Sequence, residues 1–324
     1  MTHAQIIAAA TGAALTAHRK FGIDLRKRVE IFDVLRRADT EVFFRPLNKI
    51  CGAYIPSEGG VPGVLINSNL PLSRQRYTAA HEFGHLFLGH KVASVDDILE
   101  RTTIEERGTW SVEESIAEAF AAFFLMPTPL IESSLRELHV SGELTPNAIY
   151  LISLKMGTSY HATVNHLYTL KKISFAQVKT FRDEQPKDIK RNISDRAVGR
   201  HDVWIVDEHW NGQPIFPAVE DTVVLRLPEF PTSGYAWVWE KNPEALRIVE
   251  DGFADQASDE VGGSRVREFI AEVASTAGVE QISLARRQPW DSESTPSSHF
   301  TLDLFPQQTK KTGPLNLPSL RRAG

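Results

Sequence analysis

Hydrophobic and polar residues follow two different periodicities in the N-terminal half of the chain. Apolar residues recur at helical spacing from Ala4 to about Arg19 and again from Leu25 to Arg37. The runs EVFFRPL, GAYI and GVLIN that follow are short and either apolar or alternating, which is typical of β-strands. This part of the chain is therefore predicted to be an α+β domain.

Two longer helices are predicted after these strands. Pro71 suits the start of a helix, where its missing N–H costs nothing, and the helical pattern continues through SRQRYTAAHEFGHLFLGH. A second helix is expected from Val112 to about Met126, where Pro127 and Pro129 end it. Further helices are expected up to about Arg182.

The pattern changes in the second half of the chain. The segment DEQPKDIKRNISDRAVGR is polar and charged without a sustained period, as linkers between domains often are. Beyond it, the runs DVWIVD, TVVLRL, YAWVW, REFIAEVA and HFTLDLF alternate with Gly, Pro and Ser turns, which predicts a β-sandwich. The expected division is a helix-rich core with a small sheet at 1–130, a helical subdomain at 131–183, a linker at 184–200, the β-sandwich at 201–306 and a disordered tail at 307–324.

Composition and charge narrow the classes of function. The 324 residues suffice for two domains, and a net charge of -5 gives no overall attraction to nucleic acid or to an anionic membrane. The single cysteine, Cys51, excludes an intrachain disulfide, so the cytoplasm is the expected compartment. No run approaches the roughly 20 apolar residues of a membrane helix, and the N-terminal stretch lacks the basic region of a signal peptide. A soluble protein with no membrane partner is expected.

One short motif carries metal chemistry. His81 and His85 are four residues apart on a predicted helix, so both imidazoles project from one face and can reach a single ion. Glu82, the second residue of this H-E-x-x-H string, suits a general base that accepts a proton from water and passes it to a leaving amine. The alternative is that both histidines only cover the polar edge of a core helix.

A catalytic zinc ion needs a third protein ligand from another element. Glu114 is the predicted ligand, on a helix whose apolar face would pack against the histidine helix and aim it inward, and Glu113 is the alternative. Glu118, one turn beyond, could accept a hydrogen bond from a ligand histidine. His90 either adds a polar group near the site or caps the carbonyls of the helix end. These acidic residues could also be merely solvated.

At this point the residues resemble a known family. INSNLPLSRQRYTAAHEFGHLFLGH, followed by EESIAEAFAAFFLMP, is similar to the ImmA/IrrE metallopeptidases over approximately residues 5 to 180. The resemblance implies a zincin-like, gluzincin-type zinc metalloendopeptidase in which His81, His85 and Glu114 bind the metal and Glu82 is catalytic. A ligand set of nitrogen and oxygen also accepts manganese or another divalent metal.

The same resemblance implies a biological role. Members of this family typically cleave helix-turn-helix repressors, which relieves repression, so a helix-turn-helix repressor or antitoxin is the implied protein substrate, in transcription regulation or a stress response. This chain departs from the family at Glu118, where members usually have Asn. The surroundings of the metal ligands are therefore expected to differ.

A helix-turn-helix pattern also occurs in this chain. LTPNAIYLISLKMGTSYHATVNHLYTLKKIS predicts two helices joined by a turn at Gly157, within the 131–183 subdomain. Its second helix offers little positive charge before Lys171 and Lys172, too few cations to favour direct DNA binding. Support of the metal site or reception of the repressor is the preferred interpretation.

Three turns stand out in the predicted sandwich. Gathered at one end, they would form a binding surface with Trp290 as an aromatic anchor, whereas ordinary turns around a core tryptophan are the alternative. F-P-T-S-G, V-G-G and Q-P-W resemble the loops of chagasin-type cysteine-peptidase inhibitors, which implies an immunoglobulin-like fold over roughly residues 200 to 306. Phe230 and Gln288 depart from the usual Asn and Arg. The candidate binding residues are Pro231, Thr232, Ser233, Gly234, Gly262, Gly263, Gln288, Pro289 and Trp290.

The leading hypothesis is a zinc-dependent endopeptidase that cleaves a regulatory protein. Its chagasin-like module would inhibit a papain-like cysteine peptidase, sense one, or recruit another protein. The alternative is a binding protein or cysteine-peptidase inhibitor in which the metallopeptidase fold is only a scaffold, and a DNA-binding regulator is a third possibility.

Overall fold

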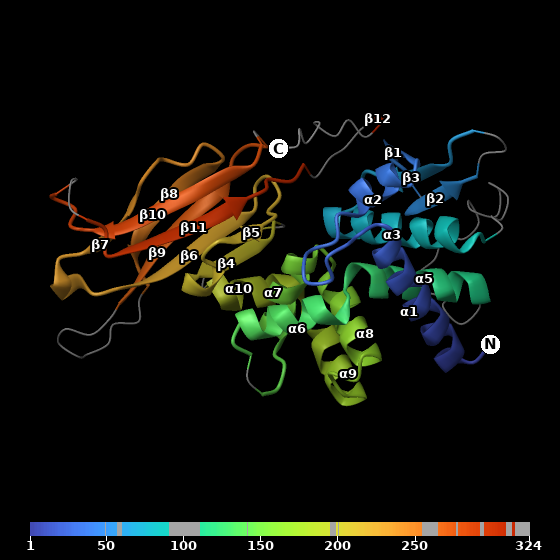
Figure 1. The fold of residues 1–324 in the computed structure, drawn as a ribbon. Helices are drawn as coiled ribbons and strands as arrows, with labels where there is room; N and C mark the ends of the chain where they lie inside the picture. Colours follow the sequence, from blue (N-terminus) through green and yellow to red (C-terminus); the bar gives the residue numbers. More distant parts are fainter. Residues whose placement is uncertain are drawn as a thin grey trace. The chain divides into compact units, whose positions relative to one another are not determined.

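The computed structural model is shown in Figure 1. It describes residues 1–48, 50–56, 60–90, 111–140, 142–194, 199, 201–254, 265–276, 278–291, 295–308 and 313–314. The chain divides into two compact units, the first containing Met1–Ser134, Met156–Val178 and the short strand β12, and the second containing Leu135–Lys155 and Lys179–Gln308. Each unit is built around its own sheet or sheets.

The first unit contains one small sheet. Its strands are β1 (Glu41–Arg45), β2 (Gly52–Ile55), β3 (Gly63–Asn67) and β12 (Gly313–Pro314), in the order β12-β1-β3-β2. β1 and β3 are parallel, and the other pairs are antiparallel. β2 is therefore an edge of the sheet among the described strands, and its outer backbone groups are not used by the ladder.

Four helices form the core of the first unit with this sheet. They are α1 (His3–Lys20), α2 (Ile31–Arg37), α3 (Leu72–Leu88) and α5 (Val112–Leu125). α3 contacts β2 and β3, and both α1 and α3 pack on α5. Phe83, Phe120 and Phe124 meet at the buried junction of these helices. The two long predicted helices, at 71–90 and 112–126, are thereby confirmed.

The remaining helices follow in the chain as α6 (Thr128–Glu137), α7 (Pro146–Met156), α8 (Tyr160–Thr169), α9 (Phe175–Asp183) and α10 (Pro186–Ser194). The predicted turn between α7 and α8 is present, with Gly157 at φ +65°. Among the described residues, no single helix is long and apolar enough to cross a membrane, and only the bent pair α5 and α6 meets that criterion jointly.

The helix predicted from Leu25 to Arg37 is shorter than expected, because only Ile31–Arg37 is helical. The buried side chain of Arg76 explains the difference. Its guanidinium donates to the carbonyl oxygen of Val29 and, at 3.0 Å, to the carboxylate of Glu30. These contacts hold the preceding backbone in a turn.

The second unit contains two four-stranded sheets. One has the order β4-β6-β9-β8 and the other β5-β11-β10-β7. The strands are β4 (Val203–Asp207), β5 (Gln213–Ile215), β6 (Thr222–Glu229), β7 (Ala236–Trp239), β8 (Leu246–Phe253), β9 (Arg265–Val273), β10 (Glu280–Arg287) and β11 (Ser298–Leu304). Trp239 of one sheet packs against Phe269 of the other, with ring centroids 5.2 Å apart. The sheets therefore share a core, and the five strands predicted here are all present.

The segment predicted as a linker at 184–200 contains helix α10. Ile189 is fully buried, and Lys190 donates to the carbonyl oxygen of His201 at 2.8 Å. The helix escaped notice because Ile189 and Ile193 are its only apolar residues, too few to establish a period.

The predicted subdomain at 131–183 is divided between the two units. Its residues Leu135–Lys155 belong to the second unit, which holds the two four-stranded sheets and is called the β-rich unit below. Tyr150 explains this assignment. Its hydroxyl donates to the carboxylate of Asp202 at 3.1 Å and accepts the backbone N–H of Val203 at 3.0 Å. These hydrogen bonds join α7 to the first strand of the β-rich unit.

The tail predicted to be disordered from Gln307 onward is partly ordered. Gln307 bridges to Ala218, and Gly313–Pro314 pairs with β1 through its backbone. The other tail residues, 309–312 and 315–324, lie outside the described residues.

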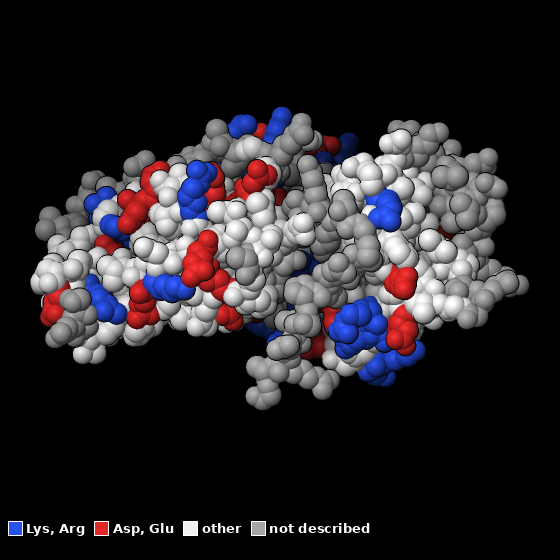
Figure 2. Space-filling view, turned by 90° about the horizontal axis from the view of Figure 1, so that it is seen from above, with Lys and Arg blue, Asp and Glu red and all other residues white. Residues whose placement is uncertain are grey.

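Charged side chains of opposite sign are interspersed on the face shown in Figure 2. Within the second unit, opposite charges also pair across neighbouring strands, for example Arg226 with Glu268 at 2.7 Å and Arg267 with Asp251 at 2.6 Å.

Candidate functional site

The two histidines of the H-E-x-x-H sequence lie one turn apart on α3. This helix is continuous and ends at Gly89, whose φ of +66° allows a left-handed cap. The spacing of four residues projects His81 and His85 from one face, and their Nε2 atoms lie 3.2 Å apart. Both imidazoles can therefore offer a ring nitrogen to the same point.

Glu114 reaches this point from the start of α5. The hydroxyl of Ser111 caps the helix by accepting the backbone N–H of Glu114 at 3.2 Å. The Glu114 carboxylate lies 3.2 Å from Nε2 of His81 and 3.6 Å from Nε2 of His85. Glu113, the alternative ligand from sequence, is exposed on α5 and lies outside the cluster.

A glycine allows the two helices to approach so closely. A Cβ atom at Gly84 would lie 3.0 Å from Cδ1 of Phe120 and 3.4 Å from Cα of Ala117. Phe120 is itself stacked on Phe124, with ring centroids 5.3 Å apart. The absence of a side chain at Gly84 therefore sets the separation of α3 and α5, and with it the distance from Glu114 to the histidines.

The three donor atoms fit a divalent metal ion. One ligand atom each from His81, His85 and Glu114 lies within 4.8 Å of the others. Ligands at ~2.0–2.1 Å from a tetrahedral zinc ion are separated by roughly 3.4 Å, which matches the distances above. Two imidazole nitrogens and one carboxylate oxygen are also a known ligand set of catalytic zinc, with one position left for water or substrate.

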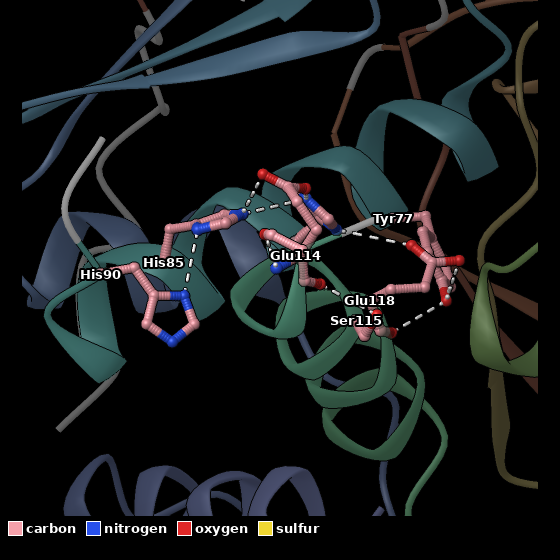
Figure 3. Close-up of polar contacts among 8 residues, drawn as sticks. Tyr77, His85, His90, Glu114, Ser115 and Glu118 are labelled. Carbon is pink, nitrogen blue, oxygen red and sulfur yellow. Dashed lines mark hydrogen bonds and ion pairs between the residues drawn. The ribbon is translucent and has the colours of Figure 1, made fainter. Parts of the chain in front are cut away.

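The other ring nitrogen, Nδ1, of each of the two ligand histidines also has a partner (Figure 3). Nδ1 of His81 lies 3.4 Å from the carboxylate of Glu118, and Nδ1 of His85 lies 3.1 Å from Nδ1 of His90. Contacts of this kind orient a ligand imidazole and leave its other nitrogen available to the metal. The hydroxyl of Tyr77 donates to the carboxylate of Glu118 at 3.2 Å.

Glu82 adjoins His81 and faces the edge strand β2. The backbone N–H of Tyr54 donates a hydrogen bond to its carboxylate. Gly52 allows this approach, because a Cβ atom there would clash with the side chain of Thr78. Burial raises the pKa of Glu82, and the charges of both ligand histidines and the Tyr54 hydrogen bond offset this only in part. A carboxylate with a raised pKa is a better proton acceptor near neutral pH.

Opposite charges stabilise one another within the cluster. Burial lowers the pKa of His81, but hydrogen bonds to Glu114 and Glu118 outweigh it and leave this pKa well above its usual value. Burial raises the pKa of Glu114, but hydrogen bonds to the two histidines outweigh it and hold this pKa well below its usual range. A divalent cation supplies the same positive charge, so metal binding is expected to displace protons from the imidazoles.

Two residues beside the site were not singled out from the sequence. Tyr77 lies four residues before His81, so helical spacing places both on one face and was the available signal. Tyr54 contacts Glu82 through its backbone, and no sequence pattern identifies such a contact.

In the β-rich unit, the structure brings two of the three predicted loops together. Pro231–Ser233 forms a short 3-10 helix that ends at Gly234, with φ +75°. A Cβ atom at Gly234 would lie 2.9 Å from the ring of Trp290. Trp290 is 72% exposed, which excludes the alternative of a core tryptophan.

The other predicted loop residues are placed as follows. Gln288 and Pro289 precede Trp290 in a turn closed by a hydrogen bond from the Asp291 N–H to the Gln288 carbonyl oxygen at 3.1 Å. Gly262 and Gly263 lie outside the described residues. The structure therefore shows one composite surface made from the loops at 230–234 and 288–291.

Comparisons with known proteins identify both parts of the chain. Residues 35–166 match the IrrE N-terminal-like domain, and residues 217–304 match the chagasin family of peptidase inhibitors, I42. Chagasin from Trypanosoma cruzi is 31% identical over 99 residues, which cover 29% of this chain and 89% of chagasin. The radiation response metalloprotease IrrE from Deinococcus radiodurans is 34% identical over 102 residues.

The coverage differs between these relatives. The match with IrrE covers 31% of this chain and 29% of IrrE, so the chain spans under a third of that protein. The cysteine protease inhibitor EhICP2 from Entamoeba histolytica has a TM-score of 0.29 and 18% identity, over 34% of this chain and 100% of EhICP2. The chain belongs to the chagasin family of peptidase inhibitors through its C-terminal domain, which is joined to an IrrE N-terminal-like domain.

Proposed function

We propose that this chain is a zinc-dependent endopeptidase. The observation that carries the proposal is the convergence of His81, His85 and Glu114 from two helices at distances that suit one tetrahedral ion. The IrrE relative supports it, because that protein is named a metalloprotease and the matching family region includes all three residues.

The residues around the cluster have separate roles in peptide hydrolysis. Zinc, when bound, supplies Lewis-acid polarisation of the scissile carbonyl and of a water molecule. Glu82 accepts a proton from the attacking water and passes it to the nitrogen of the leaving amine. The Tyr54 N–H holds the Glu82 carboxylate during both transfers. The adjacent edge strand β2 has backbone groups that can pair with an extended substrate segment.

The proposed substrate is a helix-turn-helix repressor, as the resemblance to ImmA/IrrE peptidases implies. The test incubates the full chain and zinc with the repressor encoded beside its gene. Wild type is expected to cleave the repressor, while Glu82→Gln is expected to bind zinc normally but to cleave at least about 100-fold more slowly. Glu113→Gln is the matched control, because this exposed residue precedes Glu114 without joining the cluster.

Two results would reject this function. One is the absence of cleavage by wild type loaded with zinc. The other is equal cleavage by wild type and Glu82→Gln, since the proton transfers require that carboxylate.

A second function is proposed for the C-terminal domain, namely inhibition of a papain-like cysteine peptidase. One support is the chagasin match. The other is the pair of exposed aromatic residues Phe230 and Trp290, which lie on two loops that meet where Gly234 approaches the ring of Trp290. Titration of papain with full-length Glu82→Gln is expected to inhibit, and Trp290→Ala in that background to weaken inhibition at least about tenfold. Phe175→Ala, which removes another 72% exposed aromatic residue, is the control. An unchanged papain activity would reject inhibition.

A further inference from the structure

We propose that Tyr77 is a positioning residue of the metal centre. Its hydroxyl fixes Glu118, and Glu118 in turn holds the His81 ring with Nε2 toward His85 and Glu114. The inference rests on the proposed metallopeptidase function and adds a residue that acts on the metal ligand through another side chain.

The geometry behind this inference is an alternating ladder between two helices (Figure 3). Tyr77, His81 and His85 follow one another at four-residue spacing along α3, and Glu114 and Glu118 do so along α5. Glu118 lies between Tyr77 and His81, and Glu114 lies between His81 and His85. Each carboxylate is therefore shared by two successive side chains of α3.

Glu118 divides its two oxygens between these neighbours. Oε2 lies 3.4 Å from Nδ1 of His81, and Oε1 accepts the hydroxyl of Tyr77 at 3.2 Å. The same hydroxyl lies 3.2 Å from the backbone carbonyl oxygen of Glu118, so it contacts both ends of the residue. A glutamate side chain has three rotatable bonds, and this one is 31% exposed. Without the tyrosine hydroxyl, Oε1 loses this donor, and the carboxylate is held less firmly beside His81.

The consequence for His81 concerns which ring nitrogen carries the proton. A carboxylate at Nδ1 favours the tautomer with hydrogen on Nδ1, which leaves the lone pair of Nε2 for a metal. A mobile Glu118 would relax both the tautomer and the ring orientation.

The test measures zinc affinity of the full chain by competition with a chromophoric chelator. Tyr77→Phe keeps the ring and removes only the hydroxyl, and it is expected to weaken zinc binding about three- to tenfold, below the roughly 10- to 100-fold range for partners that contact a ligand directly. The loss of zinc affinity caused by Glu118→Ala is expected to fall within that roughly 10- to 100-fold range. Tyr77→Phe should have no further effect in the Glu118→Ala background, because the path through the carboxylate is already broken.

Two measurements separate positioning from a general structural role. The cobalt(II)-loaded protein should show a changed visible absorption band in Tyr77→Phe, since the band reports ligand geometry, while thermal unfolding without metal should match wild type. Tyr168→Phe is the control, because Tyr168 lies on α8 and outside the cluster. It should leave both zinc affinity and the cobalt spectrum unchanged.

The outcomes distinguish this inference from the proposed function. Wild type that binds no zinc overturns both. Wild type that binds one zinc ion while Tyr77→Phe binds it equally well overturns only the role of Tyr77. An equal loss from Tyr77→Phe with and without Glu118 also overturns it, because the effect then does not pass through the carboxylate.

Discussion

Replacing Gly84 with alanine tests whether the close packing of α3 on α5 determines the metal centre. In a helix, alanine is more stable than glycine by about 0.5–1 kcal/mol, because glycine loses more backbone freedom on folding. Substitution of Gly12 in α1 shows this gain in stability without a steric effect, since a Cβ atom there would meet nothing within 4 Å. We therefore expect Gly12→Ala to raise the free energy of unfolding by about this amount.

At Gly84 the same gain is opposed by a steric clash. The new Cβ atom would lie 3.0 Å from the ring of Phe120. That ring cannot move freely, because it is fully buried and contacts Phe83, Phe87 and Phe124. Overpacking of a core costs about 1–3 kcal/mol. The free energy of unfolding of Gly84→Ala should thus lie about 1–3 kcal/mol below that of Gly12→Ala.

The clash also has a consequence for the site. If α5 moves away to accommodate the methyl group, Glu114 moves away from the histidines, and zinc affinity should fall about tenfold or more. Urea unfolding followed by circular dichroism and chelator competition for zinc measure the two effects. Equal stabilisation by both alanines, with unchanged zinc affinity, would show that Gly84 does not set the separation of the helices.

Burial and the charge of Asp202 raise the pKa of Asp221 from 3.8 to about 7, so the folded protein keeps a proton that the unfolded chain loses as pH rises through this window. Between pH 4 and 7 the free energy of unfolding of wild type, measured in urea titrations, should therefore fall relative to Asp221→Asn, and parallel pH profiles would contradict this. Gly234→Ala and Gly212→Ala, at φ +75° and +72°, should each cost about 1–2 kcal/mol, but only Gly234→Ala should also weaken papain inhibition, because only its Cβ meets Trp290. An equal effect on inhibition would refute that reasoning. Zinc should raise the Tm of wild type and leave that of His85→Ala unchanged in thermal unfolding, and equal shifts would place the ion elsewhere.

Local features of the sequence were sufficient to predict the helices that carry the metal ligands. The four-residue spacing of His81 and His85 requires only a helix to bring them together, and Pro127 and Pro129 mark the end of the next helix. The short β-rich runs of the second half, bounded by Gly, Pro and Ser turns, likewise predicted five of its strands, because this composition is a property of each segment by itself. The mixed α+β architecture followed from these patterns.

Other features of the metal site could be identified only from the tertiary structure, because they depend on contacts between residues that are distant in the sequence. The apolar face of the second helix favoured Glu114 over Glu113 as the ligand, but only the packing of α5 on α3 brings the Glu114 carboxylate to the histidines. The tyrosine that contacts Glu118 and the backbone N–H that contacts Glu82 are likewise set by which helix faces and strand edge meet. Sequence alone thus determined the local spacing of the metal-binding histidines, whereas tertiary packing decided which carboxylates complete and support the site, since a donor's position depends on the whole core beneath it.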